Sequence, residues 1–139
     1  MSNVTIFKNY LQGKDIYMEE VQEDNGGVFF RTRQGFDNGG SVIVVVAFND
    51  REDLVDLQIF GVASINNPLK KENVHSLINE LNKNYRFSKF MEADGNISAQ
   101  YSFNVAQSQL DPAFLMDTLI MLLRTTEESY PKFMKLQWA

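Results

Sequence analysis

Apolar side chains recur along the chain with two periods, and these periods divide it into helices and strands. The helical spacing i, i+3, i+4, i+7 and i+11 is found at Val74, Leu77, Ile78, Leu81 and Tyr85. A shorter stripe of the same kind runs from Val4 to Leu11 and stops before Gly13, a residue that favours helix ends. The pattern therefore predicts one short helix near the N-terminus and a second helix over residues 74–85.

A third helix is predicted close to the C-terminus. It begins at Asp111-Pro112, where a capping side chain precedes a proline, and Asn67-Pro68 gives the same signal before the second helix. The residues that follow Asp111-Pro112 are apolar over much of the helix girth, which indicates cover on more than one side. We expect Pro131 to kink or end this helix near Tyr130.

Between the first two helices lie four candidate strands, over residues 17–22, 28–33, 41–48 and 54–62. The glycines at 26–27 suit a hairpin, and the glycine-rich stretch 35–40 forms a second turn. The strand at 41–48 is apolar on both faces, because Val42-Ile43-Val44-Val45-Val46-Ala47-Phe48 has no polar alternation. If helices cover only one side of the sheet, this strand needs a second cover, such as another subunit or a bound chain.

The turn Asp94-Gly95-Asn96 separates two further strands and sets their register. A three-residue loop pairs Ala93 with Ile97 and Met91 with Ala99, and it also sets Phe87 against Phe103. A two-residue loop sets Met91 against Ser98 instead. Because only the first arrangement pairs apolar with apolar, we predict a three-residue loop or an equivalent bulge.

These elements give the order α-β-β-β-(β)-α-β-β-α in one domain spanning residues 1–139. Pairs of strands that follow one another favour antiparallel pairing, so the predicted fold is α+β, an antiparallel sheet with helices packed on it.

Composition narrows the functional classes. The chain has a net charge of -5 with scattered basic residues, which argues against nucleic-acid binding. The longest apolar runs, 42–48 and 119–123, are too short to span a membrane, and the first ten residues do not resemble a secretory signal. We therefore expect a cytoplasmic protein with no membrane segment. The absence of Cys removes disulfides and thiolate chemistry.

The candidate catalytic and metal-binding groups are few. His75, the single histidine, is expected beside the apolar helix face and toward solvent. The carboxylates Asp50, Glu52, Asp53 and Asp56 do not match a calcium loop, and a charged hairpin turn explains them better. A second acidic run at 19–24 suits the protection of an edge strand. The paired glycines lack the lysine of a phosphate loop. We predict no catalytic residue, no metal and no cofactor.

Apolar residues point instead to an interaction surface. The doubly apolar strand and the apolar C-terminal tail supply its candidate residues, which are Val42, Val44, Val46, Phe48, Phe133, Met134 and Trp138. Aromatic and Met side chains are enriched at protein contacts. Core packing of the tail is the competing interpretation. We expect a homodimer, with a further protein partner of unknown identity.

Five short segments resemble the YbjN-like family, which is described as bacterial sensory transduction regulators. They are Asn79-Glu80-Leu81-Asn82, Arg86-Phe87-Ser88-Lys89-Phe90, Asp94-Gly95-Asn96-Ile97, Tyr101-Ser102-Phe103 and Tyr130-Pro131. The resemblance is strongest between residues 42 and 131. It implies a fold like that of type III secretion chaperones, often dimeric, and a non-enzymatic role in binding another protein. Asn82 is the clearest match, and its implied role is a structural hydrogen bond at the helix end.

Two functions therefore remain open from the sequence. The first is a protein-binding or chaperone-like regulatory module. The alternative is a small-molecule sensor with a pocket, lined by Phe and Met, between the sheet and the last helix. A carboxylate-dependent hydrolase has no recognisable acid–base pair to support it.

Overall fold

The computed structural model describes all 139 residues, and its elements follow the predicted order. The helices are α1 (Asn3–Gly13), α2 (Lys71–Asn84) and α3 (Pro112–Gln137), with a single 3-10 turn, η1 (Pro68–Lys70), before α2. The strands are β1 (Glu19–Gln22), β2 (Val28–Gly35), β3 (Ser41–Phe48), β4 (Leu54–Ser64), β5 (Lys89–Ala93) and β6 (Asn96–Asn104).

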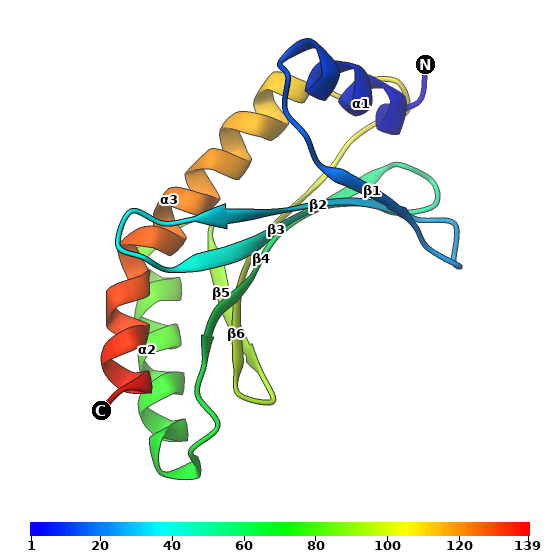
Figure 1. Cartoon of the computed structure of the whole chain (residues 1–139). Coiled ribbons are helices and arrows are strands. Elements are labelled where there is room, and N and C mark those ends of the chain that lie inside the picture. The colour runs from blue at the N-terminus through cyan, green and yellow to red at the C-terminus, as the bar shows by residue number, and fades with distance from the viewer.

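The six strands form one antiparallel sheet in the order β1-β2-β3-β4-β6-β5. All three helices lie on one side of this sheet, with α1 over the β1–β2 end, α2 at the other end, and α3 running from beside α1 to beside α2 (Figure 1). The predicted α+β fold is confirmed, and all four candidate strands between the first two helices are present. The opposite side of the sheet carries no helix, and we call it the open face.

The core lies between the sheet and the helices. At one end, the ring of Phe7 from α1 lies 5.1 Å from that of Phe30 and 5.8 Å from that of Phe48. At the other end, the ring of Phe133 on α3 packs at a tilt on that of Phe90 on β5, with their centroids 5.6 Å apart. Burial of such aromatic side chains is a major source of stability, because each removes a large apolar area from water. The short α1 depends on this packing, since an isolated helix of its length is marginal.

Strand β3 divides its apolar residues between the two faces of the sheet. Val42, Val44, Val46 and Phe48 point toward the helices and are at most 2% exposed. Ile43, Val45 and Ala47 point to the open face, where Val45 is still only 8% exposed because neighbouring side chains surround it. Both faces of β3 are therefore apolar, as predicted, but the open face has no covering layer within this chain.

The β5–β6 hairpin has a two-residue loop, so the predicted three-residue loop is wrong. Ala93 pairs with Asn96, and Met91 pairs with Ser98. Asp94 and Gly95 both have positive φ, 53° and 84°, as a type I′ turn requires. The prediction failed because it paired Met91 with Ala99, whereas Ala99 is the partner of Phe90. Phe90 points to the core instead, where it is 2% exposed.

The ends of the second and third helices differ in part from the prediction, in which Pro131 kinks or ends α3 near Tyr130 and Asn67 caps α2. Helix α3 does not end near Tyr130 but continues through Pro131 to Gln137. Figure 1 shows that its axis changes direction between the orange and red parts, which is consistent with the missing amide of Pro131. Asn67 caps η1 rather than α2, since its side chain accepts a hydrogen bond from the Leu69 amide. Helix α2 begins at Lys71 without a side-chain cap.

The glycine-rich β2–β3 turn is held against α3. The ring of Phe36 is 8% exposed and packs on Tyr130 at 5.5 Å. The Asp37 amide donates a 3.0 Å hydrogen bond to Glu127. Gly40 lies directly against the Tyr130 ring, where a Cβ atom would stand 2.5 Å from Cζ. These contacts hold the turn in place and explain why residue 40 is glycine.

Candidate functional site

A concavity of about 660 Å³ lies on the open face, above β2, β3 and β4. Its floor is apolar and consists of Phe29 on β2, Ile43 and Val45 on β3, and Phe60 on β4. Tyr17, which is 80% exposed, stands at the margin. We call this concavity the open-face groove, and we treat it as the candidate functional site because apolar side chains here meet solvent without cover.

The register of the three strands explains how the floor forms. Arg33, Ile43 and Phe60 are cross-strand neighbours in one row, and Arg31 and Val45 stand side by side in the next. Residues opposite one another in a sheet project to the same face, so these side chains gather on the open face. Phe60 lies where β4 loses register with β6, at a bulge beside Gly61, and its side chain is 40% exposed.

The rim of the groove carries charge of both signs. Arg31 donates two hydrogen bonds to the carboxylate of Glu19, at 3.1 and 3.2 Å. This pairing lowers the pKa of Glu19 and raises that of Arg31. Arg33 instead donates to the hydroxyl of Ser41 at 3.2 Å and has no carboxylate within ion-pair distance. The groove therefore keeps one guanidinium whose charge is not balanced by a neighbour.

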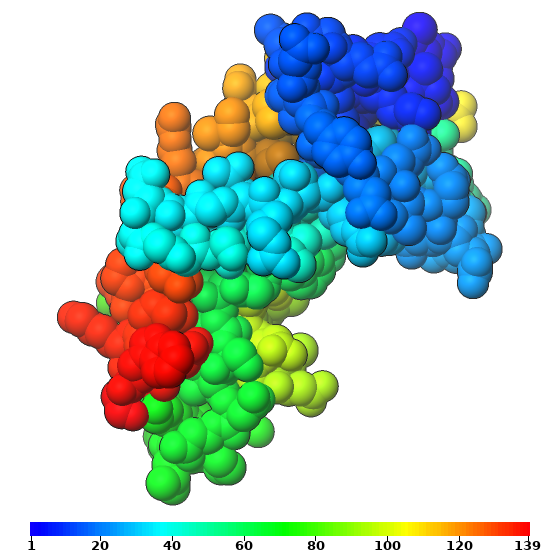
Figure 2. Space-filling model, viewed as in Figure 1, coloured from blue at the N-terminus to red at the C-terminus, as the bar shows by residue number.

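The outline of the molecule is hollowed on this side. In Figure 2 the surface recedes between the blue segment of β1 and the yellow-green turn that joins β5 to β6. The concavity of about 660 Å³ over β2, β3 and β4 makes this part of the surface hollow rather than flat. A concave apolar surface with few polar groups is typical of binding sites.

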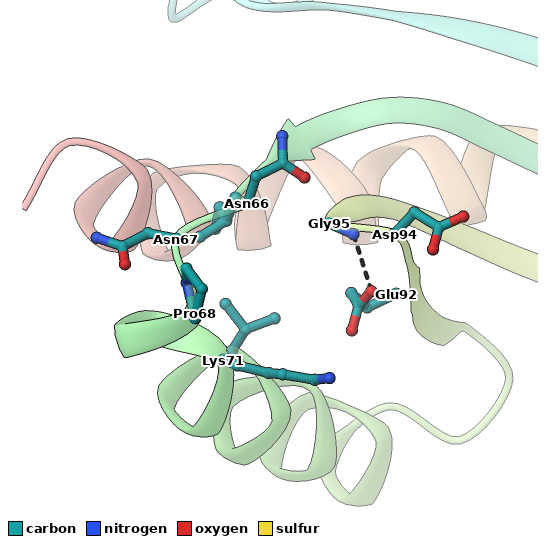
Figure 3. A pocket seen from close by; sticks show the side chains of 9 residues that line it. Asn66, Asn67, Pro68, Lys71, Glu92, Asp94 and Gly95 are labelled. Carbon is teal, nitrogen blue, oxygen red and sulfur yellow. Dashed lines mark hydrogen bonds between the residues drawn. The ribbon is translucent and has the colours of Figure 1, made fainter.

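A second, smaller concavity of about 440 Å³ is polar and lies at the opposite end of the sheet (Figure 3). Asn66 and Asn67 reach it from the β4–η1 connection, Lys71 from α2, and Glu92 and Gly95 from the β5–β6 hairpin. The Glu92 carboxylate accepts a 2.9 Å hydrogen bond from the Gly95 amide. This corner fastens the hairpin to the start of α2.

The electrostatics of this corner centre on Glu92. The hydrogen bond from the Gly95 amide lowers the pKa of Glu92, and His75 and Lys71 add to the effect. Nε2 of His75 lies 3.0 Å from the Glu92 carboxylate, and the imidazole is 53% exposed. His75 is therefore a surface residue beside the apolar face of α2, as the sequence predicted, and its partner is a single carboxylate.

The predicted acidic cluster is divided among separate structural hydrogen bonds. Glu52 accepts from the Val4 amide at 2.6 Å, at the beginning of α1. Asp53 accepts from the Asn49 side chain within the β3–β4 turn, and Asp56 accepts from the Ser102 hydroxyl on β6. These interactions agree with a charged turn, since three of the four carboxylates accept a hydrogen bond from a neighbouring donor.

Asn82 makes the structural hydrogen bonds that the resemblance implied, although at a different place. Its amide group donates to the carbonyl of Phe90 at 3.0 Å and accepts from the amide of Phe90 at 2.7 Å. Strand β5 is the last in the sheet order, so these bonds satisfy backbone groups on an edge that no strand covers. Asn82 thus ties α2 to the sheet edge.

The residues expected on an interaction surface are mostly in the core. Val42, Val44, Val46, Phe48 and Phe133 are at most 2% exposed, because they fill the layer between the sheet and the helices. Their side chains are therefore unavailable to a partner. Met134 is partly buried against the core, and Trp138 is 77% exposed at the end of α3.

The space proposed for a sensor pocket is also filled. Leu115, Leu119 and Leu122 of α3 are at most 4% exposed and belong to the same buried cluster as the sheet residues. Sequence reasoning missed the open-face groove. Its signal was the alternate set of residues on each strand, in which Phe29, Ile43 and Phe60 stand on the face away from the core.

The comparisons with known proteins identify a family. A model of the YbjN family, described as a putative bacterial sensory transduction regulator, matches residues 4–135. The chain therefore belongs to the YbjN family. No match was found among curated proteins.

A solved structure gives the same fold. The crystal structure of YbjN from E. coli, a putative transcription regulator, aligns with a TM-score of 0.60 at 11% sequence identity. The alignment covers 94% of this chain and 93% of that one. This likeness supports the fold alone. No helix of the chain combines the length and the apolar character that crossing a membrane requires.

Proposed function

We propose that this chain is a non-enzymatic regulatory module that acts by binding another protein through the open face of its sheet. Membership of a family of sensory transduction regulators supports a regulatory role. The observation that carries the proposal is the open-face groove, where Phe60 on the apolar floor is 40% exposed and Tyr17 at the margin is 80% exposed. An apolar surface of this kind is stabilised when a partner removes it from water.

The nature of the groove favours a protein partner over a reaction. Its charged groups are two guanidiniums and one carboxylate, and Arg31 and Glu19 neutralise each other. The resemblance to type III secretion chaperones agrees with this role, because it implies a protein-binding, chaperone-like module. We place the module in the bacterial cytoplasm and expect it to be a homodimer.

Site-specific photo-cross-linking in the bacterium that encodes the chain tests the proposal. p-Benzoylphenylalanine is introduced in place of Phe60, and in a control variant in place of Leu69, which is 89% exposed on η1. We expect ultraviolet light to yield a specific adduct with another protein only from position 60. Equal adducts from both positions, or none from position 60, would refute binding at the open face.

A further inference from the structure

We propose that the open-face groove binds an acidic amphipathic helix supplied by another protein. This inference rests on the proposed function and specifies the partner of the same site. It follows from three properties of the groove, which are its shape, its backbone hydrogen bonding and its charge.

The shape of the groove calls for a convex partner. The surface over β2–β4 is hollow, with a volume of about 660 Å³. In a two-fold contact between copies the same patch faces itself, so a second copy would set hollow against hollow. A protruding segment fits better. The outer two of these three strands are about 10 Å apart, which matches the 10–12 Å diameter of an α-helix.

Backbone hydrogen bonding determines the conformation of that segment. Strand β3 is paired on both sides, with β2 and with β4, over the length of the floor. The floor therefore offers side chains and no free backbone groups to an added strand. A segment lying on it must satisfy its own backbone groups, and a helix does so internally.

The length of the floor sets the number of helical turns. From Ile43 to Ala47 the open face of β3 extends for about 13 Å, or roughly two and a half turns of helix. Apolar anchors at i, i+3 or i+4 and i+7 fill such a length. We expect these anchors to contact Phe29, Val45 and Phe60.

The charge of the rim predicts an acidic residue on the helix. The whole chain carries a net charge of -5, yet the groove has two arginines and one glutamate. Glu19 pairs with Arg31, so Arg33 is left to receive a carboxylate from the partner. Complementary charge of this kind gives orientation and specificity more than affinity.

Selection from a phage-displayed library of random 16-residue peptides against the full-length chain tests this inference. We expect enrichment of peptides with apolar residues at helical spacing and at least one Asp or Glu. A synthetic copy of an enriched peptide should become helical on binding, as measured by circular dichroism. Its affinity should fall about tenfold or more in Phe60→Ser, because an aromatic anchor contact is lost.

Charge reversal provides the sharper arm of the experiment. Arg33→Glu should weaken the acidic peptides and shift the selection toward peptides with Lys or Arg. The matched control is Arg51→Glu in the exposed β3–β4 turn, which should leave the affinity and the selected sequences unchanged. Peptides that bind equally well to all variants, or no enrichment, would overturn the inference.

The outcomes also separate this inference from the proposed function. Peptides that compete at the groove but bind in an extended form, or carry basic residues, would refute the acidic helix and leave protein binding at the open face intact. Self-association of the chain that Phe60→Ser abolishes would identify a second copy as the occupant and refute the acidic helix. If no specific adduct forms from position 60 in the cross-linking experiment, both the proposed function and the acidic helix are refuted.

Discussion

Replacement of Asn82 by Ala tests how the sheet edge is held. In Asn82→Ala the chain loses two hydrogen bonds, at 2.7 and 3.0 Å, and leaves the amide and carbonyl of Phe90 without their partners. A hydrogen bond contributes about 0.5–1.5 kcal/mol net, and an unpaired buried group costs more. Ala also favours the helix by about 0.5 kcal/mol over Asn. Compared with a control Asn→Ala variant, which has the same gain in helix propensity, we expect Asn82→Ala to lower the free energy of unfolding by about 2 kcal/mol.

The matched control is Asn79→Ala, because Asn79 is an exposed residue of the same helix and makes no side-chain hydrogen bond there. Urea unfolding followed by circular dichroism gives both free energies, and the 2 kcal/mol difference corresponds to roughly 6–10 °C in Tm. Hydrogen exchange of the Phe90 amide reports the same contact locally and should accelerate at least about tenfold. If the two variants differ by less than about 0.5 kcal/mol, or if exchange of that amide is unchanged, Asn82 does not hold the sheet edge.

Three further predictions concern the glycine turn, the polar corner and the C-terminus. Gly40→Ala would press a methyl group onto the Tyr130 ring and should lower the free energy of unfolding, measured in urea, by about 1–3 kcal/mol. The control Gly35→Ala should lower it by less, and equal decreases in the two variants would rule out the contact. The fold lowers the pKa of Glu92 from 4.5, so the Glu92 carboxylate contributes to folding stability above that value and loses this contribution as the pH falls through the lowered pKa. Below pH 5 the wild type should therefore lose more stability than Glu92→Gln, and parallel pH profiles of the two proteins would contradict this. We expect sedimentation to give twice 16.0 kDa for the wild type and a weaker dimer for Trp138→Ser, since its indole is 77% exposed; a monomer at high micromolar concentration would exclude the dimer.

Hydrophobic periodicity was sufficient to predict the order of elements, because each helix and strand buries one regular face. The stripe from Val74 to Leu81 became the buried face of α2, with both of these residues at most 2% exposed. Registers and ends were harder to predict. The pairing of apolar with apolar favoured Met91 as the partner of Ala99, whereas the Asp-Gly turn imposed the register that pairs Phe90 with Ala99 and buries Phe90.

The candidate site was predictable only in part, since a doubly apolar strand does not reveal which of its faces the helices cover. The sequence correctly indicated that β3 is apolar on both faces. It assigned the interaction to Val42 and Phe48, which the helices bury, although Ile43 and Val45 are the residues on the open face. That assignment depends on contacts distant in sequence, such as Phe7 on Phe48, which no local pattern reports.

The most direct test of the open face is the affinity of the protein captured at position 60, once purified, for the wild type and for Phe60→Ser. We predict a loss of about tenfold or more, because the variant removes an aromatic side chain from the floor of the groove. Leu69→Ser, on the distant η1 turn, should bind like the wild type. An affinity for Phe60→Ser equal to that of the wild type would contradict the claim that this chain binds its partner through the open face.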